Sequence, residues 1–148
     1  MKKGFLIVAH GSRKDDANQQ VKNLVNELNN YFQSVMFEPA FMELASPTIE
    51  DGIKALAKKN MDQLIAYPYF LFKGMHFTKD IPNLIQNIIN KLEKKVDFKM
   101  LDPIGQHPKI TDLVQEELYD EVIDQLKLNK VAPSKIEDKS MELIEKNL

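Results

Sequence analysis

The 148-residue sequence contains no cysteine. That absence excludes disulfide scaffolds, cysteine-based zinc sites, iron–sulfur clusters and thiol nucleophiles. No apolar run approaches the roughly 20 residues that a membrane-spanning helix needs. The formal net charge of −2 gives no electrostatic reason to expect binding to nucleic acid. The chain must therefore bury its core without covalent staples, and its length, which suits one domain, is sufficient for that.

Three common site motifs are also missing. The sequence has no G-x-G-x-x-G after its first apolar run, no G-x-x-x-x-G-K-[ST] and no G-x-S-x-G, which counts against a dinucleotide site, a P-loop and a serine-hydrolase elbow. The start resembles a signal peptide only superficially, because apolar residues 5–9 form a short stretch and no small-residue cleavage site follows. We expect instead a buried first strand in a cytoplasmic protein, with neither nucleic acid nor membrane as a partner.

Strand-like and helix-like segments alternate along the chain. Strands are predicted at 5–9, 35–42, 64–67 and 96–101, and each is followed by apolar residues at the 3.6-residue period of a helix. Pro39 cannot donate a ladder hydrogen bond, so the second strand is predicted to lie at a sheet edge. The pattern predicts an α/β three-layer sandwich with a four-stranded parallel sheet in the order 2-1-3-4, a flavodoxin-like topology.

Helix starts and domain limits follow from local signals. Ser46 is expected to cap the second helix, with Pro47 at its first position. The third helix is predicted to begin near residues 78–80, which would place Pro82 in its first turn, where a missing N–H is tolerated. Residues 1–126 are predicted to form one domain. Residues 127–148 break the pattern and are expected to form a linker and a helical tail, which acts as an arm or is a fusion remnant.

Three potential metal ligands follow three of the predicted strands: His10, Glu43 and His76, the last in an expected loop. Ligands of open parallel sheets bind beyond the carboxyl ends of the strands, and these ends are neighbours in the order 2-1-3-4. Two imidazoles and a carboxylate suit Fe²⁺, Co²⁺, Ni²⁺ or Zn²⁺, and three protein ligands leave positions open for exchange. Taken singly, each residue is more simply a structural, solvated or capping group. Their joint placement favours a metal site.

Cationic and small polar side chains surround these candidates, namely Ser12, Arg13, Lys73 and Lys79. Arg13 can hold a carboxylate through two hydrogen bonds, so an anionic organic partner is expected. For each lysine, an ordinary surface charge is an equal alternative. The aromatic residues between positions 67 and 77 are expected mostly in the core, with some lining a flat apolar pocket. His107 is predicted to be structural, at the start of the last helix.

Four segments resemble the small class II tetrapyrrole chelatases, the group of sirohydrochlorin cobaltochelatases and ferrochelatases. They are residues 6–13 (LIVAHGSR), 41–47 (FMELASP), 68–76 (PYFLFKGMH, followed by DIP at 80–82) and 103–108 (PIGQHP), and the resemblance covers about residues 4–126. It implies a chelatase-like fold and an enzyme that inserts a divalent metal into sirohydrochlorin. It also implies that His10, Glu43 and His76 bind the metal and carry the catalysis.

The resemblance further implies a homodimer and no permanently bound cofactor, since the metal is a substrate. Residues 132–140 faintly resemble the start of precorrin-8X methylmutases, which tilts the expected metal to Co²⁺ before Fe²⁺, and the pathway to cobalamin before siroheme. Two alternatives stay open beside the chelatase. One is a non-catalytic metal or tetrapyrrole carrier, and the other is a flavodoxin-like protein that binds a phosphorylated cofactor. Zinc-dependent hydrolysis ranks below these because no substrate is suggested.

Overall fold

A four-stranded parallel sheet forms the centre of the fold. The computed structural model describes residues 1–128, except for the side chains of residues 75–78 and 126–128. It divides into a unit of residues 1–106 and a second unit from His107 onward, which are described separately. The strands of the first unit are β1 (Lys3–Ala9), β2 (Met36–Phe41), β3 (Gln63–Pro68) and β4 (Asp97–Met100). Their order is β2-β1-β3-β4, so the predicted order and the edge position of β2 are confirmed.

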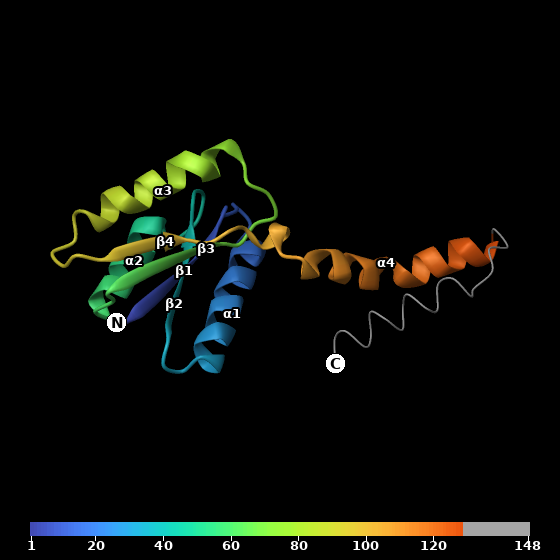
Figure 1. The fold of residues 1–148 in the computed structure, drawn as a ribbon, viewed down its shortest axis with the longest axis horizontal. Coiled ribbons are helices and arrows are strands. Elements are labelled where there is room, and N and C mark those ends of the chain that lie inside the picture. Colours follow the sequence, from blue (N-terminus) through green and yellow to red (C-terminus); the bar gives the residue numbers. More distant parts are fainter. Residues whose placement is uncertain (129–148) are drawn as a thin grey trace. The chain divides into compact units, whose positions relative to one another are not determined.

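Helices cover both faces of this sheet. The helix α1 (Asp15–Tyr31) packs on one face, against Ile7 and Ala9 of β1. The helices α2 (Ile49–Lys58) and α3 (Met75–Ile89) pack on the other, against Leu6 and Val8. Successive strand residues point to opposite faces, so β1 supplies both cores from one continuous apolar run. Figure 1 shows α1 and α3 on opposite sides of the sheet, which confirms the predicted three layers.

The helix α2 begins two residues later than predicted, because Thr48 and not Ser46 is its N-cap. The Asp51 N–H donates to the Thr48 hydroxyl oxygen over 3.1 Å, and the Thr48 N–H donates to the Asp51 carboxylate over 3.0 Å. This reciprocal pair is a capping box. The Pro47 carbonyl accepts the Phe41 N–H over 2.8 Å, which keeps the residues before Thr48 alongside the end of β2 and outside the helix.

The helix α3 begins at Met75, earlier than predicted, with Gly74 as its extended N-cap residue. His76 therefore lies in the first turn of a helix and not in a loop. Pro82 lies inside α3 and not in its first turn, so the helix tolerates the loss of one backbone hydrogen bond. The buried side of α3 holds Ile81 and Ile85, whereas Leu84 is exposed.

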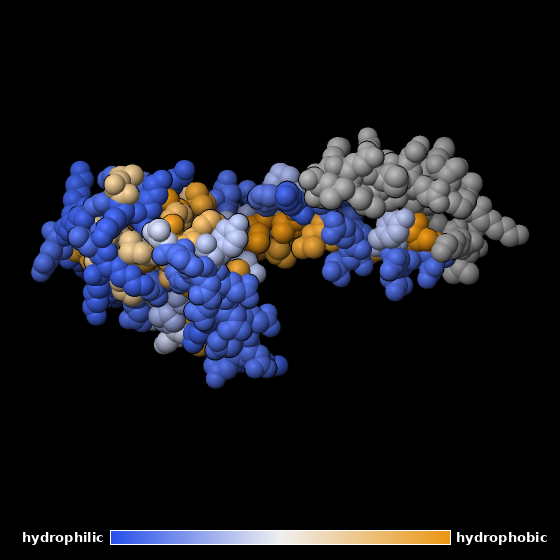
Figure 2. Space-filling model, turned by 90° about the horizontal axis from the view of Figure 1, so that it is seen from below, coloured by the Kyte–Doolittle hydropathy of each residue, from blue (hydrophilic) through white to orange (hydrophobic). Residues whose placement is uncertain are grey.

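The second unit contains the helix α4 (Lys109–Leu128). His107 lies just before it, and its Nδ1 accepts the Lys109 N–H over 3.2 Å, which agrees with the predicted structural role. Large apolar side chains of α4 are exposed, and Figure 2 shows apolar side chains on this helix between hydrophilic ones. The exposed set comprises Leu113, Val114, Leu118, Tyr119 and Val122.

The predicted tail falls almost wholly on residues 129–148, outside the described residues, and the boundary between 126 and 127 stays a prediction. Within residues 1–128, no helix is both long and apolar enough to cross a membrane.

The corrected start of α2 gives a stability prediction. Thr48→Ala removes the hydroxyl that accepts the Asp51 N–H, and loss of such a cap costs about 1 kcal/mol of unfolding free energy. Ser46→Ala, the matched control, is expected to change that energy by less than about 0.5 kcal/mol, as for most surface substitutions. Urea unfolding of both variants followed by circular dichroism checks this. Equal losses of unfolding free energy in the two variants would contradict the assignment of Thr48 as the N-cap.

Candidate metal site at the carboxyl edge of the sheet

The chain segments that leave β1 and β2 stay hydrogen-bonded beyond the ends of the strands. The Met42 N–H donates to the Ala9 carbonyl over 2.9 Å, and the Glu43 N–H donates to the His10 carbonyl over 3.1 Å. The backbones of His10 and Glu43 are therefore direct neighbours. Both side chains are exposed. The sequence-based expectation that these two candidate ligands meet at one edge of the sheet agrees with this arrangement.

Gly11 makes that close approach possible. Its φ of +89° lies in the left-handed region that favours glycine. A Cβ atom at this position would lie 1.9 Å from the Glu43 carbonyl oxygen. Any larger residue would have to push the two chain segments apart. The contact that holds His10 beside Glu43 therefore requires a glycine at position 11.

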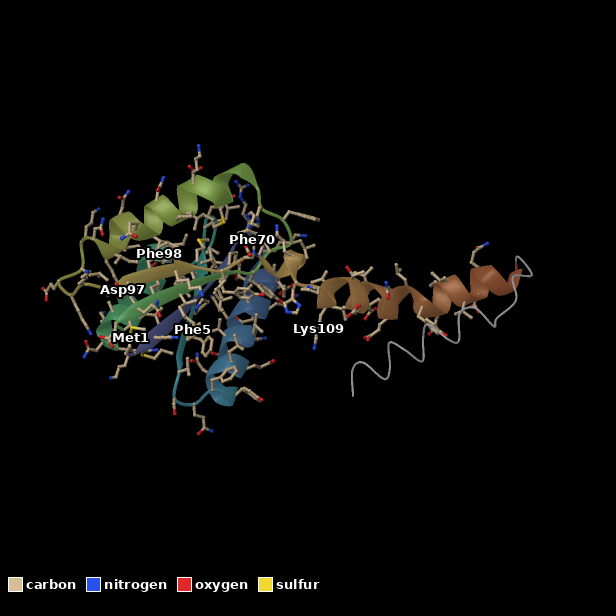
Figure 3. All side chains as sticks on the ribbon, in the orientation of Figure 1. Met1, Phe5, Phe70, Asp97, Phe98 and Lys109 are labelled. Carbon is tan, nitrogen blue, oxygen red and sulfur yellow. The ribbon has the colours of Figure 1, made fainter. Side chains whose placement is uncertain are left out.

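The segment after β3 reaches the same edge. The Tyr69 N–H donates to the Val8 carbonyl over 2.7 Å, which extends the pairing of β3 with β1 by one residue. The Phe70 ring then lies against the His10 imidazole, with 4.8 Å between ring centroids and 40° between ring planes. Figure 3 shows Phe70 toward the end of the sheet opposite to Met1 and Asp97. His10 is thus placed between segments from β2 and β3.

The third predicted ligand, His76, is placed only by its backbone, because its side chain is among those outside the description. It lies in the first turn of α3, six residues after Phe70. The described residues contain no group of three or more histidine, aspartate or glutamate side chains arranged to hold a metal ion. The set of His10, Glu43 and His76 therefore stays a prediction.

The cations predicted to bind an anionic partner differ in their surroundings. The Lys73 ammonium lies 2.6 Å from an Asp102 carboxylate oxygen, and both side chains are exposed, at 39% and 71%. The charge of Lys73 is thus offset by a neighbour. Arg13 is exposed and forms no ion pair with any described residue, and Lys79 is exposed on α3. Of these cations, we expect Arg13 to be the most available to a carboxylate.

Large apolar side chains are exposed in the segments that follow the strands at this edge. The expectation that the aromatic residues lie mostly in the core is wrong for Phe72, which is 80% exposed. Tyr67 is half-buried, and burial raises the pKa of its phenol. Phe77 lies outside the described side chains. The exposed set in these segments comprises Leu44, Tyr69, Leu71 and Phe72.

The short helix η1 (Ile104–Gln106) lies against the segment after β3, backbone to backbone. A Cβ atom on Gly105 would lie 2.0 Å from the Leu71 carbonyl oxygen. The motif at residues 103–108 therefore contributes a structural contact to this edge, and the Lys73–Asp102 ion pair lies beside it.

Asn18 of α1 belongs to this edge and was not identified from the sequence. It is the only buried polar side chain of the described residues, at 5% exposure. Its Oδ1 accepts the Ser12 N–H over 2.9 Å, and its Nδ2 donates to the Ser12 carbonyl over 2.7 Å. The Ser12 hydroxyl accepts the Lys14 N–H over 3.0 Å, just before α1 begins. The available signal was an asparagine in line with Val21 and Val25 on the buried side of α1.

The chain is similar to known proteins over most of its length. Residues 4–121 match the family model described as CbiX. The sirohydrochlorin cobaltochelatase of Sulfolobus acidocaldarius is 33% identical over 76% of this chain and 87% of its own length. The chloroplastic sirohydrochlorin ferrochelatase of Arabidopsis thaliana is 30% identical over 78% of this chain, which spans about half (51%) of that relative.

Among solved structures, the sirohydrochlorin chelatase SirB from Bacillus subtilis subspecies spizizenii, in complex with cobalt, is similar with a TM-score of 0.72. It is 28% identical, and the match covers 81% of this chain and 51% of that chain.

Gly11 provides a test of the contact between the β1 and β2 ends. Gly11→Ala is expected to lower the unfolding free energy by about 1–3 kcal/mol, because a side chain is strained at this φ and its Cβ meets the Glu43 carbonyl. Gly74→Ala is the control, since no atom lies within 4 Å of its added Cβ; because alanine is a poorer N-cap residue than glycine, a small loss of less than about 1 kcal/mol is expected. Urea unfolding measures the stability of both variants. A Gly11→Ala variant as stable as the wild type would contradict the described contact.

Proposed function

Because this chain belongs to the CbiX family, we propose that it is a lyase-class chelatase, an enzyme that inserts a divalent metal into sirohydrochlorin. The observation that carries the proposal is the direct backbone link between His10 and Glu43 at the carboxyl edge of the sheet. An imidazole and a carboxylate at a shared open edge can take a borderline divalent cation, and His76 on α3 is proposed as the third ligand.

We propose Co²⁺ as the first metal and Fe²⁺ as the second. The support comes from the relatives by name and from a sequence resemblance. The sirohydrochlorin cobaltochelatase of Sulfolobus acidocaldarius is 33% identical to this chain, and the Arabidopsis ferrochelatase is 30% identical. The faint resemblance of residues 132–140 to the start of precorrin-8X methylmutases favours cobalt. Cobalt would place the reaction in cobalamin biosynthesis, and iron would place it in siroheme biosynthesis.

The exposed apolar side chains at this edge suit a large flat ring. Phe72 and Leu44 present apolar surface without a covering group in the described structure, and contact with a macrocycle would remove that surface from water. Arg13 is proposed to hold a peripheral carboxylate of the ring in a bidentate hydrogen bond. Ser12, Lys73 and Lys79 are proposed to contribute further polar contacts to the same ring.

The side chains proposed as metal ligands can also accept the protons that metal insertion releases. Metal insertion releases two pyrrole N–H protons, so a base must lie within hydrogen-bond reach of the ring nitrogens. Glu43 or a ligand histidine is proposed as that acceptor. A histidine must be neutral to bind a metal, so metal binding should weaken in acid. The metal enters as a substrate, and we propose no permanently bound cofactor.

We also propose that the enzyme works as a homodimer, as the resemblance of its motifs to the small chelatases implied, and that it is located in the cytoplasm. Light scattering coupled to size-exclusion chromatography measures the mass in solution.

The test of the proposed reaction is a metallation assay with anaerobic sirohydrochlorin and Co²⁺ or Fe²⁺, followed by absorbance. His10→Ala and His76→Ala are each expected to lower the rate at least about tenfold, because each removes a proposed metal ligand. His107→Ala is the matched control. Its ring nitrogen caps α4, so metallation should stay near the wild-type rate.

Three outcomes would contradict the proposal. Near-normal rates in both the His10→Ala and His76→Ala variants would remove the metal site from the reaction. Stoichiometric binding of metal and ring by the wild-type chain, without metallated product, would favour the carrier alternative. A yellow protein that retains a nucleotide would favour the flavodoxin-like alternative.

The Lys73–Asp102 ion pair gives a separate prediction. Asp102→Asn removes the carboxylate that competes for Lys73, so the KM for the anionic ring should fall about two- to fivefold, since exposed charge pairs contribute up to about 1 kcal/mol. The kcat should stay unchanged. Steady-state metallation kinetics at low and at high salt check this, because salt screens an electrostatic gain. A KM that is unchanged at low salt would exclude Lys73 from ring binding.

A further inference from the structure

Two asparagines of α1 make the same kind of contact at opposite ends of the helix. Asn18 binds the backbone N–H and carbonyl of Ser12, at 2.9 and 2.7 Å. Asn29 binds the backbone N–H and carbonyl of Phe37, both at 3.0 Å. In each pair the amide oxygen accepts and the amide nitrogen donates. One side chain thus fixes both polar groups of a backbone residue that no strand ladder satisfies.

The helix period explains why both asparagines face the sheet. They are 11 residues apart, which is about three turns of 3.6 residues, so they project from the same side of α1. Val21 and Val25 lie between them and are buried against the sheet. The two contacts therefore bracket one apolar stripe, and each secures a different part of the chain.

The two anchored residues differ in what surrounds them. Phe37 is the second residue of β2, where that edge strand begins, and its ring is buried in the core. Ser12 lies two residues after His10, in the segment that includes Gly11 and Arg13. The Asn29 contact thus secures an edge strand, whereas the Asn18 contact secures the segment that carries a proposed metal ligand and a proposed substrate-binding cation.

We propose that Asn18 is a positioning residue of the metal site, which holds the segment from His10 to Arg13 in its binding geometry; this rests on the proposed chelatase function. The segment is fixed at its start by the Glu43 N–H, which donates to the His10 carbonyl. It is fixed at its end by Asn18. With both ends held, the φ of +89° at Gly11 is maintained between them. Without Asn18, the end at Ser12 is free to move and the imidazole loses its defined direction.

The burial of Asn18 strengthens the argument. A buried amide without partners is costly, and here both of its polar groups are satisfied by a single residue. An apolar residue would be the simpler choice on the buried stripe of α1 if only packing mattered. The amide instead fixes the path of the chain segment that follows β1, through two directional hydrogen bonds. Groups that orient metal ligands in this way typically change metal affinity 10–100-fold when they are removed.

The experiment compares Asn18→Ala with Asn29→Ala, because the two variants lose equivalent hydrogen bonds from the same helix. The probe is Co²⁺ alone, titrated into the full-length protein and followed by the visible absorption of bound Co²⁺. Asn18→Ala is expected to weaken Co²⁺ binding at least about tenfold and to change the shape of the absorption bands. Asn29→Ala should bind within about twofold of wild type with unchanged bands. Urea unfolding should show that both variants lose stability.

The outcomes separate this proposal from the proposed function. A wild-type protein that binds no Co²⁺ would overturn the proposed cobaltochelatase function. A wild-type protein that binds Co²⁺, together with equal affinities and bands in the two variants, would overturn the positioning role alone. If Asn18→Ala does not fold, Asn18→Asp is compared with Asn29→Asp. Each keeps the size of the side chain and one acceptor oxygen, and the same difference in Co²⁺ binding is expected.

Discussion

The hydrogen bond from the Glu43 N–H to the His10 carbonyl is the contact on which the rest of the site depends. It continues the pairing of β1 and β2 past their ends and brings two functional side chains onto adjacent segments. It also dictates the glycine that follows His10, because the Glu43 carbonyl occupies the space of a side chain there. The Phe70 ring and the Asn18 amide then act on a segment whose path is already defined.

Much of the fold could be predicted because it depends on patterns of several residues. The apolar run at residues 5–9 and the proline at position 39 were enough to place β1 inside the sheet and β2 at its edge. The order of strands then placed His10 and Glu43 at one edge. Such features depend on burial and topology. Many residues of the sequence contribute to the pattern that indicates them, so no single side chain decides them.

The errors concern contacts that one or two atoms decide. Ser46 and Thr48 are both good caps by residue type, and the carboxylate of Asp51 selects Thr48. The early start of α3 was missed because Pro82 was expected near a helix start, although a proline inside a helix costs one hydrogen bond when packing compensates. Asn18 could be placed on the buried side of α1 from its spacing to Val21 and Val25, but its role was missed because its partner is the Ser12 backbone, which the sequence does not indicate.

The outer edge of β2 has a consequence for how copies of the chain can associate. Pro39 has no N–H to offer, and the Phe37 N–H and carbonyl are already occupied by Asn29. This edge of the sheet is therefore unfavourable for pairing with an added strand. Natural proteins commonly protect edge strands in such ways against aggregation. Two copies that meet at this edge must do so through side-chain surfaces, because a continuous sheet built across both β2 strands is disfavoured.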